Sequence, residues 1–168
     1  VPAPSGRAAA GTGRPVASLL GDARFRVAVL AGVVSFGVMS FVMTAAPLSM
    51  HVHHQHSVEA AGWVIQSHVM AMFLPSLASG RLIARFGERV MMLWGVALLA
   101  GCALVSLSGH ALAQYWAALV LLGVGWNLLF VAGTTLLARE FSDENRHRVQ
   151  AMNESIVFGT QASVSLLA

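Results

Sequence analysis

Lysine is absent from this sequence of 168 residues, and Asp and Glu together number only 7, so arginine alone supplies the positive charge. The chain is 57% hydrophobic and 10% charged, whereas an ordinary soluble domain carries about 25% charged residues. A soluble domain this short could not bury so much apolar surface, because small domains leave much of their surface exposed. The composition therefore indicates a chain that lies largely in a lipid bilayer.

Other absences exclude several classes of function. Cys102 is the single cysteine, so there is no disulfide framework. The arginines form no clustered patch with aromatic residues, so we predict no binding to nucleic acid. There is no Walker loop, no zinc-protease helix motif and no serine elbow, and the glycines of GVGWN (123–127) lie in an apolar run rather than after a soluble strand. We therefore predict neither an enzyme nor a bound cofactor.

Long apolar runs take the place of charge. At about 1.5 Å per residue, roughly 20 helical residues cross a hydrocarbon core of about 30 Å. The run from 90 to 138 is too long for one span, and SLSGH at 106–110 offers a break. We predict an all-α membrane protein, a transmembrane helix bundle with four complete spans and a partial fifth. The expected spans are about 27–48, 60–80, 90–107, 113–137 and 149–168.

The arginines also predict the orientation of the chain. Residues 1–24 are rich in Pro, Ala, Gly and Ser and have the composition of a linker that precedes the membrane part, 25–168. When the loops are assigned alternately to two sides, every arginine falls on the side of this linker. Positively charged loops face the cytoplasm. We therefore expect a multi-pass protein of the inner membrane, with the linker and the loops at 81–89 and 139–148 cytoplasmic.

The turn GRLIARFGER, residues 80–89, carries a more specific pattern. Helical geometry would place Arg81, Arg85 and Arg89, which are spaced four apart, on one face. Gly80 permits a helix end or a close approach of helices, and Gly87 permits a positive φ in a tight turn. The turn therefore reads as a short cytoplasmic connection between two spans.

This turn resembles the signature loop of the major facilitator superfamily. That loop reads Gly, three residues, Asp, a basic residue, any residue, Gly, any residue and two basic residues. Gly80, Arg85, Gly87 and Arg89 match it, whereas Ala84 stands where the Asp should be and Val90 where the last basic residue should be. The segments FVMTAAPLSM, QSHVMAMFLPSLASGRLIARFG and GVGWNLLFVAGTTLL also look like a bacterial branch of this family, and the resemblance covers about residues 25–168.

The resemblance implies a secondary transporter that moves a small solute by alternating access, coupled to a proton gradient. In that family the full motif lies between the second and third helices, and a degenerate copy lies between the eighth and ninth. The missing acid and the preceding linker favour a fragment of the second half, helices seven to ten with part of eleven. Helices one to five of the first half would have the same topology, so this assignment remains an alternative. The implied partners are the lipid bilayer, a small solute and the missing other half of the transporter.

Polar residues within the spans are the candidates for the solute site, because such residues are costly in a membrane. Asn127 lies midway along the fourth predicted span beside Trp126. It would either contact solute, with Trp126 as an apolar wall, or form an interhelical hydrogen bond. Gln66 and His68 lie in the outer part of the second span, where they would line a vestibule, although His68 is also compatible with helix packing.

Two further hypotheses concern titratable side chains. Glu154 is the only acid inside an apolar run, so it is the candidate for proton coupling, and a salt-bridged carboxylate at the interface is the alternative. The loop sequence HVHHQH supplies imidazoles, which suit zinc, copper and nickel. The competing function is therefore a membrane scaffold or a metal-binding membrane protein, and its candidate ligands are His51, His53, His54 and His56.

Overall fold

The computed structural model describes residues 20–140 and 143–167, so most of the predicted linker at 1–24 lies outside the described residues. Every regular element among the described residues is helical, which confirms the all-α prediction. The elements are α2 (Ala23–Leu48), η1 (Ser49–His53), α3 (Val58–Phe73), α4 (Ser76–Ser108), α5 (Leu112–Glu140) and α6 (Asp143–Leu167).

Local side chains explain where α2 and α3 begin. The Asp22 carboxylate accepts a hydrogen bond of 2.8 Å from the backbone N–H of Arg24, and the Ser57 hydroxyl accepts one of 3.1 Å from the N–H of Ala60. Both residues satisfy backbone donors that a helix start leaves without an intrahelical partner. Near its other end α2 contains Pro47, and the wider π turn η1 follows directly. The chain thus leaves the regular helix close to the proline, which cannot donate a backbone hydrogen bond.

The predicted span at 60–80 is not one continuous helix. It is divided between α3 and α4 by Pro75, which has no N–H to continue the helical hydrogen-bond ladder. The chain then runs through the first part of α4 to Gly87, where φ is 81° and ψ is 161°. Glycine adopts this backbone conformation readily, whereas other residues would be strained in it. The positive φ expected at Gly87 is therefore confirmed, and the chain changes direction at this bend.

Three helices among the described residues are long and apolar enough to cross a membrane: Ala23–His53, Ser76–Ser108 and Leu112–Arg139. The sequence predicts more spans, and the difference has two causes. α3 alone has 16 residues, whereas a span needs about 20. α6 contains Asn153, Glu154 and Gln161 within its apolar run, which lowers its mean hydropathy.

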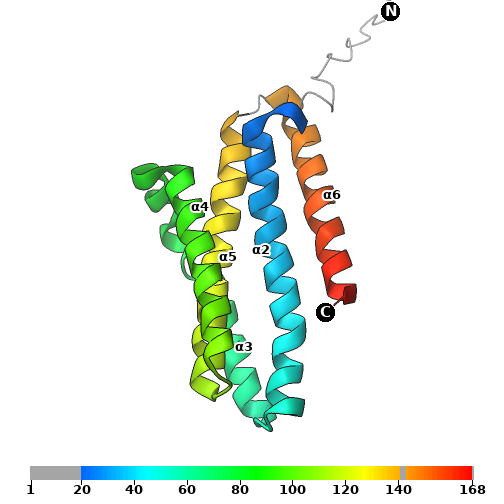
Figure 1. Ribbon diagram of the computed structural model, residues 1–168. Helices are drawn as coiled ribbons and strands as arrows, with labels where there is room; N and C mark the ends of the chain where they lie inside the picture. The colour runs from blue at the N-terminus through cyan, green and yellow to red at the C-terminus, as the bar shows by residue number, and fades with distance from the viewer. Residues whose placement is uncertain (1–19, 141–142, 168) are drawn as a thin grey trace, which may run out of the picture.

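The bundle is built around α5, which packs against α2, α3 and α4, while α6 packs mainly against α2 (Figure 1). α5 is the most buried of the three apolar helices. A smaller cluster closes the end of the bundle where α5 finishes and α6 begins, and its buried members are Phe25, Ala28, Val29, Leu137 and Val149. Large apolar side chains such as Leu77, Leu93 and Leu107 are exposed on the outer faces, as expected for helices that contact lipid.

Two glycines let α5 pass very close to two neighbours. A Cβ at Gly123 would lie 2.7 Å from the carbonyl oxygen of His68 on α3. A Cβ at Gly125 would lie 3.0 Å from the carbonyl oxygen of Gly95 on α4. Small residues at such positions allow helix backbones to approach each other, which strengthens van der Waals packing in a membrane. The two glycines therefore fix α5 between α3 and α4.

Candidate functional site

A cavity of about 380 Å³ lies between α2, α5 and α6. Its walls combine aromatic, aliphatic and polar side chains. They come from Phe36 on α2, from Phe130, Thr134, Thr135, Leu137 and Ala138 on α5, and from Arg146, Val149, Gln150, Asn153, Glu154, Val157 and Phe158 on α6. Pockets of this size that are mostly apolar, with a few convergent polar groups, are typical binding sites for small molecules.

Aromatic rings form one wall of the cavity. The ring of Phe36 meets those of Trp126, Phe130 and Phe158 edge-on, with centroids 5.2, 5.2 and 5.5 Å apart. Trp126 does not line the cavity itself, but its ring stacks on that of Phe130 at 5.1 Å, because the two residues are one helical turn apart on α5. Edge-to-face contacts of this kind hold rings in defined orientations. Three helices thus present a fixed aromatic surface.

The polar groups of the cavity come mainly from α6. Asn153 is 7% exposed, and its Oδ1 atom has no hydrogen-bond partner. An unsatisfied buried acceptor costs roughly 1–3 kcal/mol, so a bound molecule that donates to this oxygen would gain from it. Glu154 also lines the cavity, and its Oε1 atom accepts a hydrogen bond of 3.1 Å from Nε2 of Gln150. The hydroxyls of Thr134 and Thr135 donate to carbonyls of their own helix, which leaves their oxygens able to accept.

Asn127 faces a different part of the bundle from this cavity. It is 1% exposed, and its Nδ2 atom donates to the carbonyl of Met72 at 2.8 Å and to Oγ of Ser76 at 2.6 Å. The amide therefore bridges the end of α3 and the start of α4 across Pro75. Its Oδ1 atom and the Nε1 atom of Trp126 have no hydrogen-bond partner. Of the two residues predicted to contact solute here, Trp126 packs against the aromatic wall, and Asn127 connects the end of α3 to the start of α4.

Gln66 and His68 both lie on α3 but point in different directions. His68 is 1% exposed, and its Nδ1 atom donates to the carbonyl of Leu119 on α5 at 2.8 Å. Gln66 is exposed and lines a shallow groove between α3 and α5 together with Trp63 and Trp116. Neither residue lines the cavity between α2, α5 and α6. The fold therefore separates the four predicted solute-binding residues into distinct environments.

The arginine turn differs from the expected single face. Arg81 and Arg85 share the first part of α4, and the guanidinium of Arg85 lies 5.3 Å from the centroid of the Phe86 ring. Arg89 follows the bend at Gly87, so helical spacing no longer relates it to the other two. Gly80 is helical, and nothing lies within 4 Å of the place a Cβ would take. The prediction of one arginine face was wrong for Arg89 because glycine interrupts the helix.

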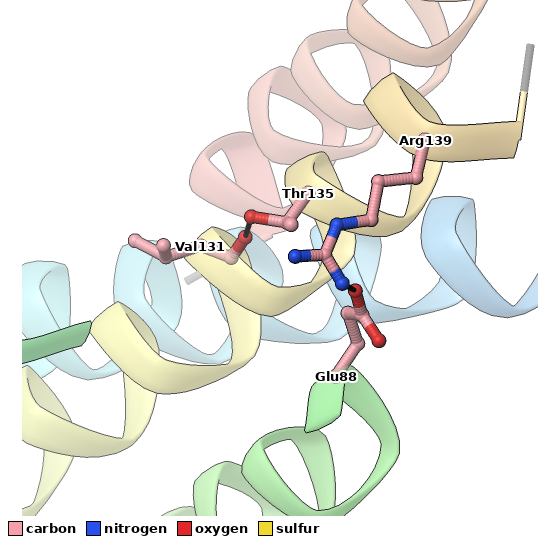
Figure 2. A network of polar contacts seen from close by, with 4 residues as sticks. All are labelled: Glu88, Val131, Thr135 and Arg139. Atoms are coloured by element: carbon pink, nitrogen blue, oxygen red, sulfur yellow. Dashed lines mark hydrogen bonds and ion pairs between the residues drawn. The ribbon is translucent and has the colours of Figure 1, made fainter. Parts of the chain in front are cut away.

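An ion pair next to this bend was not predicted. Glu88 directly follows Gly87 and binds the guanidinium of Arg139 near the end of α5 (Figure 2). One turn before Arg139, the Thr135 hydroxyl donates to the carbonyl of Val131 at 2.7 Å, as Figure 2 also shows. Sequence spacing could not reveal the pair, because its members are 51 positions apart.

The four histidines proposed as metal ligands do not converge. Among the described residues, no group of three or more His, Cys, Asp or Glu side chains is arranged to hold a metal ion. His51, His54 and His56 instead make hydrogen bonds through a ring nitrogen to backbone carbonyls. The metal-binding alternative therefore finds no support in this fold.

A bundle with three helices long and apolar enough to cross a membrane, among the residues that the structure describes, is typical of a multi-pass membrane protein. The chain belongs to the Major Facilitator Superfamily, whose family model matches residues 28–168. This confirms the resemblance seen in the arginine turn. The names of its curated relatives show that this family includes transporters.

Three curated relatives are similar to the chain. The riboflavin transporter RfnT of Brucella anthropi is 43% identical over 157 residues, which are 94% of this chain and 39% of the relative. The uncharacterized MFS-type transporters YdeG and YddS of Bacillus subtilis are 35% and 40% identical over 122 and 102 residues, which cover 71% and 60% of this chain and 28% and 23% of the relatives. The chain thus spans less than half the length of these relatives. No solved structure gives a significant match.

Proposed function

We propose that this chain is part of a secondary transporter that moves a small solute across the bacterial inner membrane by alternating access. The observation that carries the proposal is the cavity between α2, α5 and α6, which combines a fixed aromatic wall with an unsatisfied amide oxygen at Asn153. Transporters place their solute between two opposing bundles near the middle of the membrane. In this proposal a second helix bundle faces the cavity, and the arginine-rich end of the bundle faces the cytoplasm.

The proposed solute is a planar aromatic heterocycle with polar edges, and riboflavin is the first member to test. The rings of Phe36, Phe130 and Phe158 supply flat apolar contact area, while Asn153 supplies an acceptor for an N–H group at the edge of a ring system. The name of the relative from Brucella anthropi points to the same class of molecule. The cavity and the relative are independent reasons for this choice.

Proton coupling through Glu154 is the second part of the proposal. Among the described residues that line the cavity, Glu154 is the only carboxylate, and it is exposed rather than enclosed in the core. It lies on the same wall as Arg146 and accepts a hydrogen bond from Gln150. A carboxylate that borders both the solute cavity and an aqueous side can exchange its proton with water. We therefore assign to Glu154 the proton that accompanies the solute.

The test is uptake of radiolabelled riboflavin by the full-length protein in proteoliposomes, with and without a proton gradient. Phe130→Ala removes one ring of the aromatic wall and should raise KM about fivefold, the effect of about 1 kcal/mol of aromatic contact. Phe73→Ala is the matched control, because Phe73 is exposed on α3 and does not line the cavity. Glu154→Gln should abolish the response to the gradient. Riboflavin flux that equals that of empty liposomes would refute the solute assignment.

A further inference from the structure

Three segments of the chain lie at the end of the bundle opposite the arginine turn (Figure 1). The imidazole rings of His54 and His110 stack with centroids 4.1 Å apart, and the ring of Tyr115 lies within 6.4 Å of both. Nε2 of His56 donates to the carbonyl of His110 at 2.9 Å. We name His54, His56, His110 and Tyr115 the histidine latch. It joins the segment after η1 to the loop that precedes α5 and to the first turn of α5.

The hydrogen bonds of the latch leave its rings free to take a proton. Nδ1 of His54 lies 3.0 Å from the carbonyl of Ser49 and 3.1 Å from the Tyr115 hydroxyl, which itself lies 2.7 Å from Oγ of Ser49. A carbonyl only accepts, so the hydrogen of neutral His54 sits on Nδ1 and its Nε2 is unprotonated. The same reasoning places the hydrogen of His56 on Nε2 and leaves Nδ1 unprotonated. Protonation therefore adds charge to the latch without removing these hydrogen bonds.

Little negative charge is available to balance that added charge. Glu59 is the only Asp, Glu, Lys or Arg between residues 27 and 80 and between 90 and 138. It lies in the first turn of α3, where its own backbone N–H and the Ser57 hydroxyl hold its pKa below the usual range. The other titratable groups on these segments are His51 and His53, which would add positive charge. Imidazole ordinarily titrates near pH 6.5.

The segment that carries the latch is also held in a costly backbone conformation. Gln55 has a φ of 56°, which is unfavourable for a residue with a Cβ. The N–H of His56 donates to the carbonyl of Met50 at 2.9 Å, and the latch contacts hold the other side of the segment. Loss of the stacked contact would therefore release a segment that has a more relaxed conformation available to it.

We propose that the histidine latch is a proton-sensitive contact that fixes the end of α2 to the start of α5. When the rings are neutral, the stack of His54 on His110 and the hydrogen bond from His56 keep the latch closed. When both stacked rings carry a proton, like charges face each other with no carboxylate between them, and the latch opens. Acid on this side of the membrane thus frees the end of the helix that carries Phe36.

The experiment measures the distance across the latch in the full-length protein, without any solute. Spin labels are attached at Val52 in η1 and at Leu107 at the end of α4, which are 54% and 85% exposed, after other reactive cysteines have been replaced. Double electron–electron resonance then gives distance distributions at about pH 8 and about pH 5.5, on either side of the ordinary titration of imidazole. We expect a longer and broader distribution at the lower pH.

Two variants test the cause of this change. His110→Gln removes one charge of the stack but keeps the backbone carbonyl that accepts from His56, so it should abolish most of the pH response. His53→Gln removes the same charge from the same segment outside the latch, so it should retain the response. The proposal fails if the unmodified latch gives one distribution at both pH values. It fails equally if His110→Gln responds as fully as the parent, or if His53→Gln loses the response to the same extent.

Discussion

Glu88 binds the guanidinium of Arg139, and this ion pair joins the bend after the first part of α4 to the last turn of α5. The Glu88 side chain is 17% exposed and that of Arg139 is 58% exposed, so water partly screens the pair. It fixes the position of the bend relative to the helix at the centre of the bundle. Since α5 also carries Phe130 and Trp126, the bend is mechanically connected to the aromatic wall of the cavity.

A double-mutant cycle at this pair should give a small coupling energy. Pairs with one exposed partner contribute about 0.2–1 kcal/mol. The loss of unfolding free energy in the double variant should therefore differ from the sum of the losses in Glu88→Gln and Arg139→Gln by no more than this amount. Arg89→Gln is the control, because Arg89 is exposed on the same turn. Thermal unfolding in detergent at low and high salt is the measurement, and the coupling should fall as salt increases. A coupling of zero at low salt would show that the pair does not hold the bend.

Gly87→Ala should destabilise the protein, because the new Cβ would have to occupy a backbone region that favours glycine. The expected loss is on the order of 1–3 kcal/mol of unfolding free energy, measured as a lower unfolding temperature. Gly80→Ala provides the comparison within the same turn. Gly80 is helical with open space around it, so alanine there should be neutral or stabilising by up to about 1 kcal/mol. Equal effects of the two substitutions would contradict the role of the positive φ.

Gly123→Ala should force α3 and α5 apart. The added methyl group would lie 2.7 Å from the carbonyl oxygen of His68, and backbone cannot move aside as a flexible side chain can. We expect a loss of about 1–3 kcal/mol, the usual cost of overpacking. Gly101→Ala is the matched control, since its methyl group would meet only the side chain of Leu121 at 3.6 Å. If both variants unfold at the temperature of the parent, the close crossing of α3 and α5 is absent in the membrane.

Asn127→Ala should impair transport by the full-length protein while leaving membrane insertion intact. The substitution removes the two hydrogen bonds that hold Met72 and Ser76 across Pro75, at a cost of roughly 1–3 kcal/mol. Because Asn127 does not line the cavity, kcat should fall more than KM rises. Ser108→Ala, which removes an exposed hydroxyl bound to its own helix, serves as the control. Unchanged flux would remove Asn127 from the functional residues, and a change confined to KM would make it a solute contact instead.

The helical fold could be predicted from the sequence because length and apolarity decide whether a segment can cross a membrane. The strongest apolar runs lie in α2, in the second part of α4 and in α5, and the positive φ of Gly87 followed from the tight turn. The break at Pro75 was visible as a proline in an apolar run. The expected span at 60–80 nevertheless includes Pro75, because hydropathy is averaged over a long window and does not detect a local break in a helix.

The cavity could not be predicted, because its walls come from residues far apart in the chain. Phe36, Phe130 and Phe158 occupy three helices, and only the packing of α2 against α5 and α6 brings their rings together. The sequence gives only a weak indication that Asn153 lines a site, because it is a polar residue in an apolar run, like Glu154 beside it. Asn127 and His68 were recognised as buried polar groups, but their hydrogen-bond partners on other helices could be named only from the structure.

Because Gly123 and Gly125 bring the backbone of α5 against α3 and α4, those three helices have almost no room to slide past one another. In the proposed transporter we expect them to move as one block, whereas α2 meets α6 through side-chain contacts such as Val157 against Gly32. Diversification toward new solutes would therefore be concentrated on the α6 side of the cavity. The glycine pair, although it touches no solute, would tolerate the fewest substitutions.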